Sequence, residues 1–196
     1  MKLVELAHSQ IAAVLRPGEF AIDATVGNGL DTLFLARCVG PAGRVYGFDI
    51  QTEAITITRN KLRNEGLESR TQLILGSHAD LDRNIASEHQ QRIKAFMFNL
   101  GYLPGGDKSI TTTPQSTWTA LKSACLHLLP GGLISVLCYT AHAGGQFETD
   151  QVKKFLTTVP EDFRVIVHRP EKTLKAPPES IVIERLNIRN QGFGEK

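Results

Sequence analysis

Residues 20–32 read Phe-Ala-Ile-Asp-Ala-Thr-Val-Gly-Asn-Gly-Leu-Asp-Thr. The segment Phe20–Asp23 predicts a short buried strand, and Leu30–Cys38 predicts a helix. Between them, Gly27 and Gly29 can adopt positive φ and let a ligand approach the backbone closely, while the first amides of the helix stay free. A strand, a glycine turn and a helix in this order are typical of the first unit of an open parallel sheet.

The rest of the chain repeats this alternation of strands and helices. The pattern predicts strands at 20–23, 44–49, 72–75, 95–98, 133–139, 163–167 and 180–184, and helices at 4–15, 30–38, 52–64, 114–129 and 147–156. The last two strands are too close for a crossover helix, so they should form an antiparallel hairpin. We therefore expect an α/β, Rossmann-like, seven-stranded and mostly parallel sheet with helices on both faces and a C-terminal antiparallel hairpin.

Length and composition favour a single domain over residues 1–196. Hydrophobic residues make up 41% of the chain and charged residues 21%, an ordinary globular balance. No apolar run approaches the ~20 residues of a membrane span, and the N-terminus lacks a signal-peptide pattern, so we expect a cytoplasmic protein without a membrane partner. The three cysteines form no CxxC pair, and we expect no metal site.

A nucleoside-cofactor site is expected at the carboxyl ends of the first three strands. Asp49 ends the second strand 20 residues after Gly29, where a carboxylate can accept both ribose hydroxyls. Nicotinamide and methyl-donor cofactors both use this geometry. Thr32 stands where a dinucleotide fingerprint needs glycine, and Asp31 suits a cationic amino acid moiety, so we favour the methyl donor S-adenosyl-L-methionine. The predicted cofactor residues are Asp23, Gly27, Asn28, Gly29, Asp31, Thr32, Asp49, Gln51, Ser77 and His78.

The stretch Asn99-Leu100-Gly101-Tyr102 follows the fourth strand and suits an amine substrate. The Asn99 side-chain oxygen and the Leu100 carbonyl can accept two amine hydrogens, which directs the nitrogen lone pair at the methyl group. Tyr102 can stack on a base or form a pocket wall. An ordinary tight turn, with Tyr102 in the core, is the structural alternative.

The loop after the fifth strand supplies further candidates. His142 is the best-placed general base, with a pKa near neutrality, although a binding or structural role fits nearly as well. Tyr139, Arg169, Lys172 and Lys175 are predicted to bind substrate, with a solvated surface loop as the alternative for the basic residues. Residues 103–108 have the composition of a lid.

Three segments carry a resemblance to a known family. Residues 23–32, 98–108 and 139–145 resemble the YtqB-like class I S-adenosylmethionine-dependent methyltransferases, over nearly the whole chain. The resemblance implies N-methylation of the aminomethyl group of wobble 5-aminomethyl-(2-thio)uridine in tRNA, with the anticodon stem-loop as partner. Thr25 and the sequence Asn-Leu-Gly-Tyr depart from the broad class I pattern, and the narrower family shares both features.

Other functions fit the same residues. A small-molecule amine or another RNA would also suit the site, as would a non-catalytic S-adenosylmethionine-binding module or a nicotinamide oxidoreductase. The net charge of +2 is small for an enzyme that binds tRNA. We therefore expect a homodimer, in which a second subunit would enlarge the basic surface.

Overall fold

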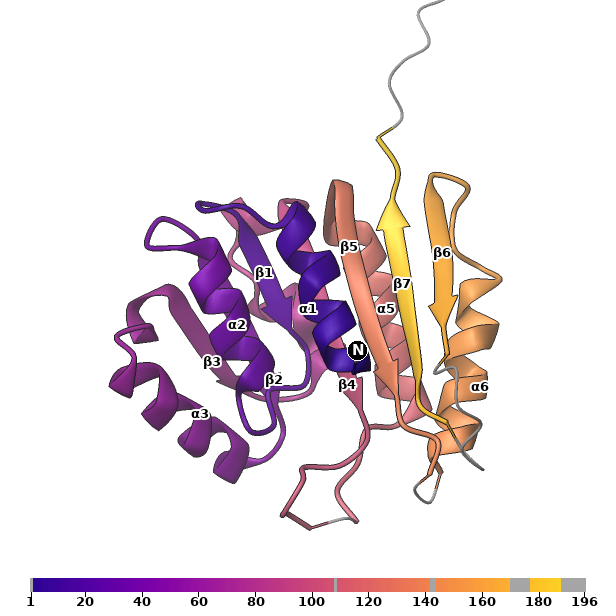
Figure 1. Cartoon of the computed structure of the whole chain (residues 1–196), viewed down its shortest axis with the longest axis horizontal. Coiled ribbons are helices and arrows are strands. Elements are labelled where there is room, and N and C mark those ends of the chain that lie inside the picture. The colour runs from indigo at the N-terminus through magenta and orange to yellow at the C-terminus, as the bar shows by residue number, and fades with distance from the viewer. Residues whose placement is uncertain (1, 108, 142–143, 170–176, 188–196) are drawn as a thin grey trace, which may run out of the picture.

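The computed structural model describes residues 2–107, 109–141, 144–169 and 177–187. One sheet runs through this part of the chain in the order β3-β2-β1-β4-β5-β7-β6 (Figure 1). The strands are β1 (Phe20–Asp23), β2 (Arg44–Asp49), β3 (Thr71–Leu75), β4 (Ile93–Leu100), β5 (Leu128–Cys138), β6 (Phe163–His168) and β7 (Glu179–Arg185). Pairing is parallel from β3 to β5, and β7 is antiparallel to both β5 and β6. The predicted mostly parallel sheet and its terminal hairpin are confirmed.

Helices cover both faces of this sheet, as predicted. They are α1 (Leu3–Val14), α2 (Leu30–Val39), α3 (Thr52–Asn64), α4 (Leu81–Asn84), α5 (Pro114–His127) and α6 (Gly145–Leu156), with short 3-10 turns η1 (Glu68–Arg70), η2 (His78–Asp80) and η3 (Ser87–His89). In Figure 1, α1 and α2 lie in front of the sheet and α5 lies behind it. No described helix is long and apolar enough to cross a bilayer.

Alternation along the strands explains the two layers. Successive side chains of a strand point to opposite faces, so buried apolar residues divide between two clusters. In β4, Phe96 and Phe98 pack with α5 and α6, whereas Ala95 and Met97 pack with α1 and α2. Because β4 is buried on both faces, its run of apolar residues is continuous, as is usual for a central parallel strand.

The boundary between α5 and β5 differs from the prediction. We expected a helix over 114–129 that stops at Pro130-Gly-Gly and a strand from Leu133. Instead, α5 ends at His127 and β5 begins at Leu128, which pairs with Ile93. The Pro-Gly-Gly sequence lies within β5, next to a shift in its register with β4. A Cβ on Gly132 would lie only 2.7 Å from the Lys94 carbonyl, so the two backbones are very close here. Glycine here permits a close backbone approach rather than a helix stop.

The strand order has a topological switch point between β1 and β4. Strands β2 and β3 extend the sheet on one side of β1, and the chain then returns to place β4 on the other side. In open α/β sheets, ligands bind beyond the carboxyl ends of the strands at such a switch point. These ends form the lower edge of Figure 1, where the loop between β4 and α5 projects.

Candidate functional site

A cavity of about 910 Å³ lies at this edge of the sheet. Its walls come from α1, from the segments after β1, β2, β3 and β5, and from the β4–α5 loop. Ten of the predicted site residues line it: Gly27, Asn28, Asp31, Asp49, Gln51, Ser77, His78, Asn99, Tyr102 and Tyr139. Segments far apart in sequence thus meet in one cavity of a size typical of cofactor sites.

Asp49 organises the glycine turn from the end of β2. Its Oδ2 accepts a hydrogen bond from the Gly27 amide at 2.8 Å, and its Oδ1 accepts one from the Gln51 amide at 2.9 Å. Gly29 has φ +79° and caps α2 in the left-handed conformation, and a Cβ there would clash with Thr58. Glycine at this position is therefore a steric requirement of the turn as well as a conformational one.

Asp23 and Thr32 lie behind the cavity wall rather than on it, and each is fully buried. The Asp23 carboxylate accepts hydrogen bonds from the Thr25 amide at 3.1 Å and from the Thr32 hydroxyl at 2.5 Å. Burial, with a smaller contribution from the nearby Asp31 carboxylate, raises the pKa of Asp23 from 3.8 to about 7. These two predicted cofactor residues therefore stabilise the turn and do not line the cavity. Gly29, the third predicted cofactor residue outside the cavity wall, also belongs to this turn.

The side chain of Asn99 is fixed by Asp31. Its Nδ2 donates to Asp31 Oδ2, and Asp31 Oδ1 contacts His8 Nε2 at 2.6 Å. The Asn99 amide nitrogen donates to Thr25 Oγ1 at 2.7 Å. The remaining polar atom, Asn99 Oδ1, is buried and has no hydrogen-bond partner among the residues that the structure describes. Most buried acceptors in proteins are paired, and an unpaired one in a residue that lines a cavity can accept a hydrogen bond from a ligand group.

His78 connects the β1 turn to α5. Its Nδ1 is 3.0 Å from the Ala24 carbonyl, and its Nε2 is 3.2 Å from Ser116 Oγ. Because a carbonyl only accepts, Nδ1 carries the hydrogen and Nε2 accepts from the serine hydroxyl. Burial lowers the pKa of His78, which favours this neutral form. Ser77 caps η2 by accepting from the Ala79 amide at 3.1 Å.

The β4–α5 loop folds back on itself beside the cavity. Tyr102 forms an antiparallel bridge with Thr111, and Gly101 and Thr112 exchange backbone and hydroxyl hydrogen bonds. The Thr112 hydroxyl in turn donates to Glu148 of α6 at 2.7 Å. Residues 101–107 and 109–112, which we call the flap, are thus joined to α6 through Thr112.

Apolar side chains surround the cavity opening. Leu30 is 66% exposed, Ile50 is 55% exposed and Tyr139 is 41% exposed, and all three line the cavity. Burial raises the pKa of Tyr139, and the neighbouring Asp31 carboxylate adds to the effect. Exposed apolar groups grouped around one opening are typical of a ligand site.

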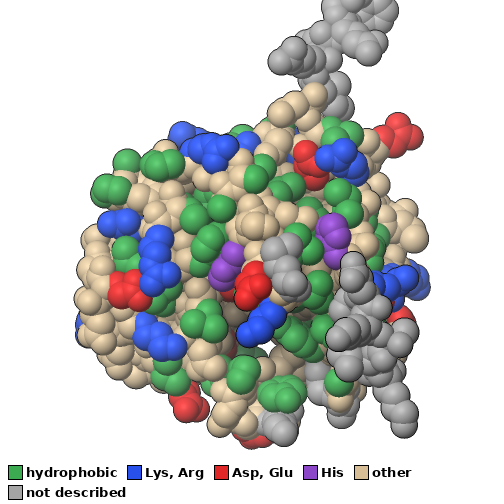
Figure 2. All heavy atoms as spheres, viewed as in Figure 1, with side chains coloured by type: hydrophobic (Ala, Val, Ile, Leu, Met, Phe, Trp, Pro, Cys, Tyr) green, Lys and Arg blue, Asp and Glu red, His purple; other side chains and the backbone are tan. Residues whose placement is uncertain are grey.

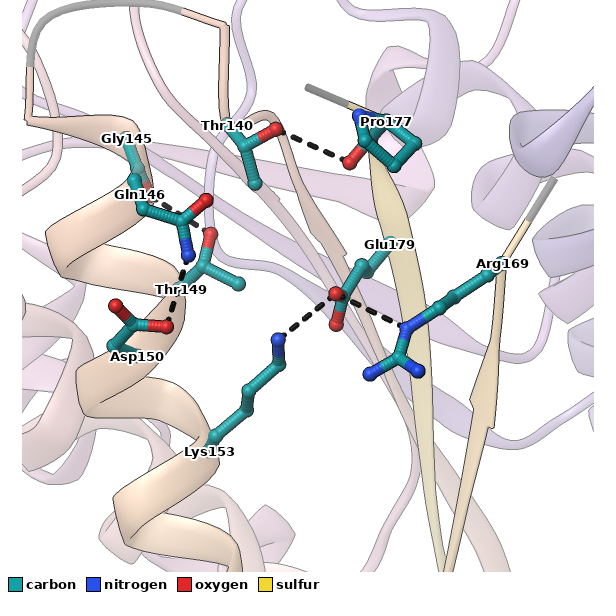
Figure 3. A network of polar contacts seen from close by, with 9 residues as sticks. All are labelled: Thr140, Gly145, Gln146, Thr149, Asp150, Lys153, Arg169, Pro177 and Glu179. Carbon is teal, nitrogen blue, oxygen red and sulfur yellow. Dashed lines mark hydrogen bonds and ion pairs between the residues drawn. The ribbon is translucent and has the colours of Figure 1, made fainter. Parts of the chain in front are cut away.

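Arg169 lies outside this cavity. Figure 3 shows it beside Lys153 and Glu179, where both cations contact the same carboxylate oxygen, Arg169 Nε at 3.2 Å and Lys153 Nζ at 2.8 Å. Thr140 donates to the Pro177 carbonyl in the same view, which joins the end of β5 to the start of β7. The predicted residues His142, Lys172 and Lys175 lie outside the described residues.

The opposite part of the surface carries mixed charge. Figure 2 shows Lys and Arg side chains over the α2 and α3 side of the front face, with acidic groups between them. On α2 and α3 two arginines are paired: Arg37 with Glu65 at 2.6 Å and Arg63 with Glu68 at 2.8 Å. Over the described residues no group of three His, Cys, Asp or Glu side chains could hold a metal ion.

Sequence reasoning missed His8, Thr25 and Glu148. Each contributes a side-chain hydrogen bond to a site residue or to the flap. His8 and Glu148 sit in amphipathic helices, where a polar residue on the inner face is the only signal available. Thr25 occupies a position of the turn that glycine often fills, and that departure was the available signal for a side-chain role.

Comparison with known proteins agrees with this geometry. A family model described as "Putative rRNA methylase" matches residues 45–184. A curated relative from Arabidopsis thaliana, "tRNA (mnm(5)s(2)U34)-methyltransferase, chloroplastic", is 39% identical over 168 residues, which are 81% of this chain and 60% of that protein. The chain therefore spans about 60% of the length of that relative.

Two solved structures are similar over nearly their full lengths. A "putative rRNA-methylase" from Clostridium thermocellum superposes with a TM-score of 0.90 at 40% identity, covering 95% of this chain and 98% of that one. A "putative methyltransferase" from Streptococcus mutans in complex with SAH gives a TM-score of 0.85 at 36% identity, covering 95% and 99%. The sheet of this protein is that of the class I methyltransferases, and the chain belongs to the family described as "Putative rRNA methylase".

Proposed function

We propose that this protein is an S-adenosylmethionine-dependent methyltransferase that N-methylates the aminomethyl group of wobble 5-aminomethyl-2-thiouridine in tRNA. Two relatives support the proposal: one is named as a tRNA (mnm(5)s(2)U34)-methyltransferase, and the other was solved with SAH. The single observation that carries it in this structure is the buried, unpartnered Asn99 Oδ1 in a side chain that lines the cavity.

The residues at the cavity fit S-adenosylmethionine. Each Asp49 oxygen accepts one backbone hydrogen bond and keeps a lone pair for a ribose hydroxyl. The exposed Ile50 side chain beside it offers apolar contact for a purine ring. Asp31 supplies negative charge for the cationic amino acid end. When bound, the cofactor supplies an electrophilic methyl group on a positively charged sulfur.

The amide of Asn99 has a defined orientation. A carboxylate accepts hydrogen bonds and cannot donate them, so the atom facing Asp31 must be Nδ2. The other end of the amide is therefore the acceptor Oδ1. When an amine donates one N–H to this oxygen, its nitrogen lone pair points away from the oxygen. The carbonyl of the neighbouring Leu100 is a candidate acceptor for the second N–H. Two fixed acceptors would orient the nitrogen for in-line attack on the methyl carbon.

The amine must also lose its proton. An aminomethyl group resembles a lysine amine, with a pKa of about 10 in water, so deprotonation at pH 7 costs roughly 4 kcal/mol. A cationic sulfonium nearby and the apolar rim around Leu30 and Ile50 both disfavour the ammonium form. The site thus lowers the cost of forming the free amine without requiring a strong base.

Recognition of the RNA uses the surface around the cavity. Tyr139 and Tyr102 line the opening and offer aromatic faces to an unstacked base. Arg169 is accessible on the neighbouring surface and can contact phosphate. We propose in addition that Lys172 and Lys175 contact the anticodon stem-loop, that His142 assists at the amine, and that the protein is a cytoplasmic homodimer. The methyl donor site in this proposal uses the lining residues Gly27, Asn28, Asp31, Asp49, Gln51, Ser77 and His78, with Asp23, Gly29 and Thr32 supporting the turn behind them.

The decisive experiment is a methylation assay on tRNA that lacks the final methyl group. The protein is incubated with S-adenosylmethionine and this tRNA, which is then digested to nucleosides for mass measurement. We expect conversion of aminomethyl-thiouridine to its methylated form by the wild type and by the control Asn64→Ala, whose exposed side chain lies far along α3. Asn99→Ala should lose at least about a hundredfold in rate while retaining cofactor affinity.

Other outcomes would redirect the assignment. Cofactor binding without tRNA methylation would point to a small amine or another RNA as substrate. Full activity of Asn99→Ala would remove the amide from the mechanism. A monomer mass in light scattering at working concentration would contradict the proposed dimer.

A further inference from the structure

Three side chains form a continuous hydrogen-bonded series at the cavity. His8 Nε2 lies 2.6 Å from Asp31 Oδ1, and Asp31 Oδ2 accepts from Asn99 Nδ2. They come from α1, from the first turn of α2 and from the end of β4. The series therefore links a helix at the start of the chain to the residue that carries the proposed chemistry.

Asp31 is buried, so its carboxylate depends on hydrogen bonds from His8 and Asn99. Its side chain is 5% exposed, and a carboxylate removed from water needs donors to each oxygen. His8 and Asn99 supply one donor to each oxygen. Because the carboxylate is the acceptor, His8 Nε2 must carry a hydrogen, whatever the state of Nδ1.

The ring of His8 is itself held in place. It stacks on Phe34 with ring centroids 3.9 Å apart and an interplanar angle of 3°. His8 is 26% exposed, and its buried part contacts the Phe34 phenyl ring and the Asp31 carboxylate. A stacked imidazole with one directed N–H fixes where the carboxylate sits, and the other carboxylate oxygen then fixes the Asn99 amide.

We infer that His8 is a positioning residue for methyl transfer, which acts through Asp31 to keep the acceptor oxygen of Asn99, rather than its NH₂ group, available to the substrate amine. The chemical consequence rests on the proposed function. Without His8, the Asp31 carboxylate loses one hydrogen-bond donor and can rotate. The Asn99 side-chain amide is then no longer held in a single orientation. An inverted amide would present donors to an amine that needs acceptors.

A matched pair of substitutions separates this role from packing. His8→Gln keeps an N–H donor near the position of Nε2, and His8→Met has similar length without a donor. Loss of a hydrogen bond to a charged group predicts a fall in kcat of roughly ten- to a hundredfold for His8→Met. We expect His8→Gln to stay within about threefold of the wild type. Equal losses in both variants, or none in either, would overturn the inference.

A double-mutant cycle shows whether the effect passes through Asn99. In an Asn99→Ala background, His8→Met should change kcat by less than about threefold, because the amide that it positions is already gone. Independent losses that multiply would identify His8 as a packing residue only. Thermal unfolding of each variant controls for a general loss of structure.

A measurement without substrate keeps the inference separate from the proposed function. The side-chain NH₂ signals of Asn99 in ¹H–¹⁵N spectra, assigned by their loss in Asn99→Ala, report directly on the bond to Asp31. We expect them to shift in His8→Met and to stay near their wild-type positions in His8→Gln. Unchanged signals in His8→Met would refute the positioning role. Absence of tRNA methylation in the wild type, with these shifts present, would refute only the proposed substrate.

Discussion

Replacing Asp23 with asparagine should make the stability of this protein less dependent on pH between about pH 5 and pH 8. Asp23 is fully buried, and its pKa is raised to about 7 by burial and by the Asp31 and Asp49 carboxylates. In the unfolded chain its pKa is about 3.9. The folded state therefore binds more protons than the unfolded state over this range, and the free energy of unfolding falls as pH rises.

The magnitude follows from the size of the shift. About three pKa units at ~1.36 kcal/mol each give a total near 4 kcal/mol, of which about 3 kcal/mol develops between pH 5 and pH 8. Asparagine imitates the protonated carboxyl: its oxygen can accept from the Thr25 amide, and its NH₂ can donate to Thr32 Oγ1. The variant should keep the structure of the turn without the charge.

Urea unfolding of wild type and Asp23→Asn at several pH values tests this expectation. The stability difference in favour of the variant should grow by about 3 kcal/mol from pH 5 to pH 8. Every other titrating group is present in both proteins, so the difference reports the titration of Asp23 together with its effect on the neighbouring Asp31 and Asp49 carboxylates. A difference that does not change with pH would refute the reasoning, since it would mean that Asp23 is ionised throughout this range in the folded protein.

Two further predictions concern the glycine turn and the flap. Gly29→Ala adds a Cβ that clashes with Thr58 in a left-handed residue, whereas Gly66→Ala adds one at φ +67° with nothing within 4 Å. Urea unfolding should show a loss of about 1–2 kcal/mol for the Gly66 variant and a clearly larger loss for Gly29→Ala, and equal losses would argue against the clash. Glu148→Ala removes the acceptor that holds the flap at Thr112, so amide hydrogen exchange at Thr112 should accelerate at least tenfold; unchanged exchange would show that the flap is held elsewhere.

The order of strands and helices was predictable because short, local sequence patterns determine each element. Apolar runs such as 95–98 and turns such as Gly40-Pro-Ala-Gly mark elements without any knowledge of their neighbours. The place of β7 between β5 and β6 was not predictable in this way, because it depends on pairing across the sheet. The start of β5 was missed for a related reason: Leu128 is held in a strand by Ile93, far away in sequence.

In the site, too, locally encoded features were predictable and long-range contacts were not. Asp49, Asn99 and Tyr139 were predicted because each lies at or just after the carboxyl end of a strand, and the carboxyl ends of parallel strands meet at one edge. His8 contacts Asp31 from 23 residues away, and Asp31 contacts Asn99 from 68 residues away. Such pairings depend on how α1 packs across the sheet. A histidine in an amphipathic helix carries no local sign that it faces a carboxylate.

Three carboxylates crowd the turn after β1, and the structure satisfies each one differently. Asp49 accepts hydrogen bonds from two backbone amides, Asp31 accepts from two side-chain donors, and the pKa of the buried Asp23 is raised to about 7. None of them has a lysine or arginine partner among the described ion pairs. A protein selected for stability alone would neutralise such a cluster, because like charges raise one another's free energy. A cluster left without permanent cations is complementary to a cationic ligand. Independently of the amide geometry at Asn99, the negative charge of this cluster favours the charged methyl donor over its neutral-sulfur product.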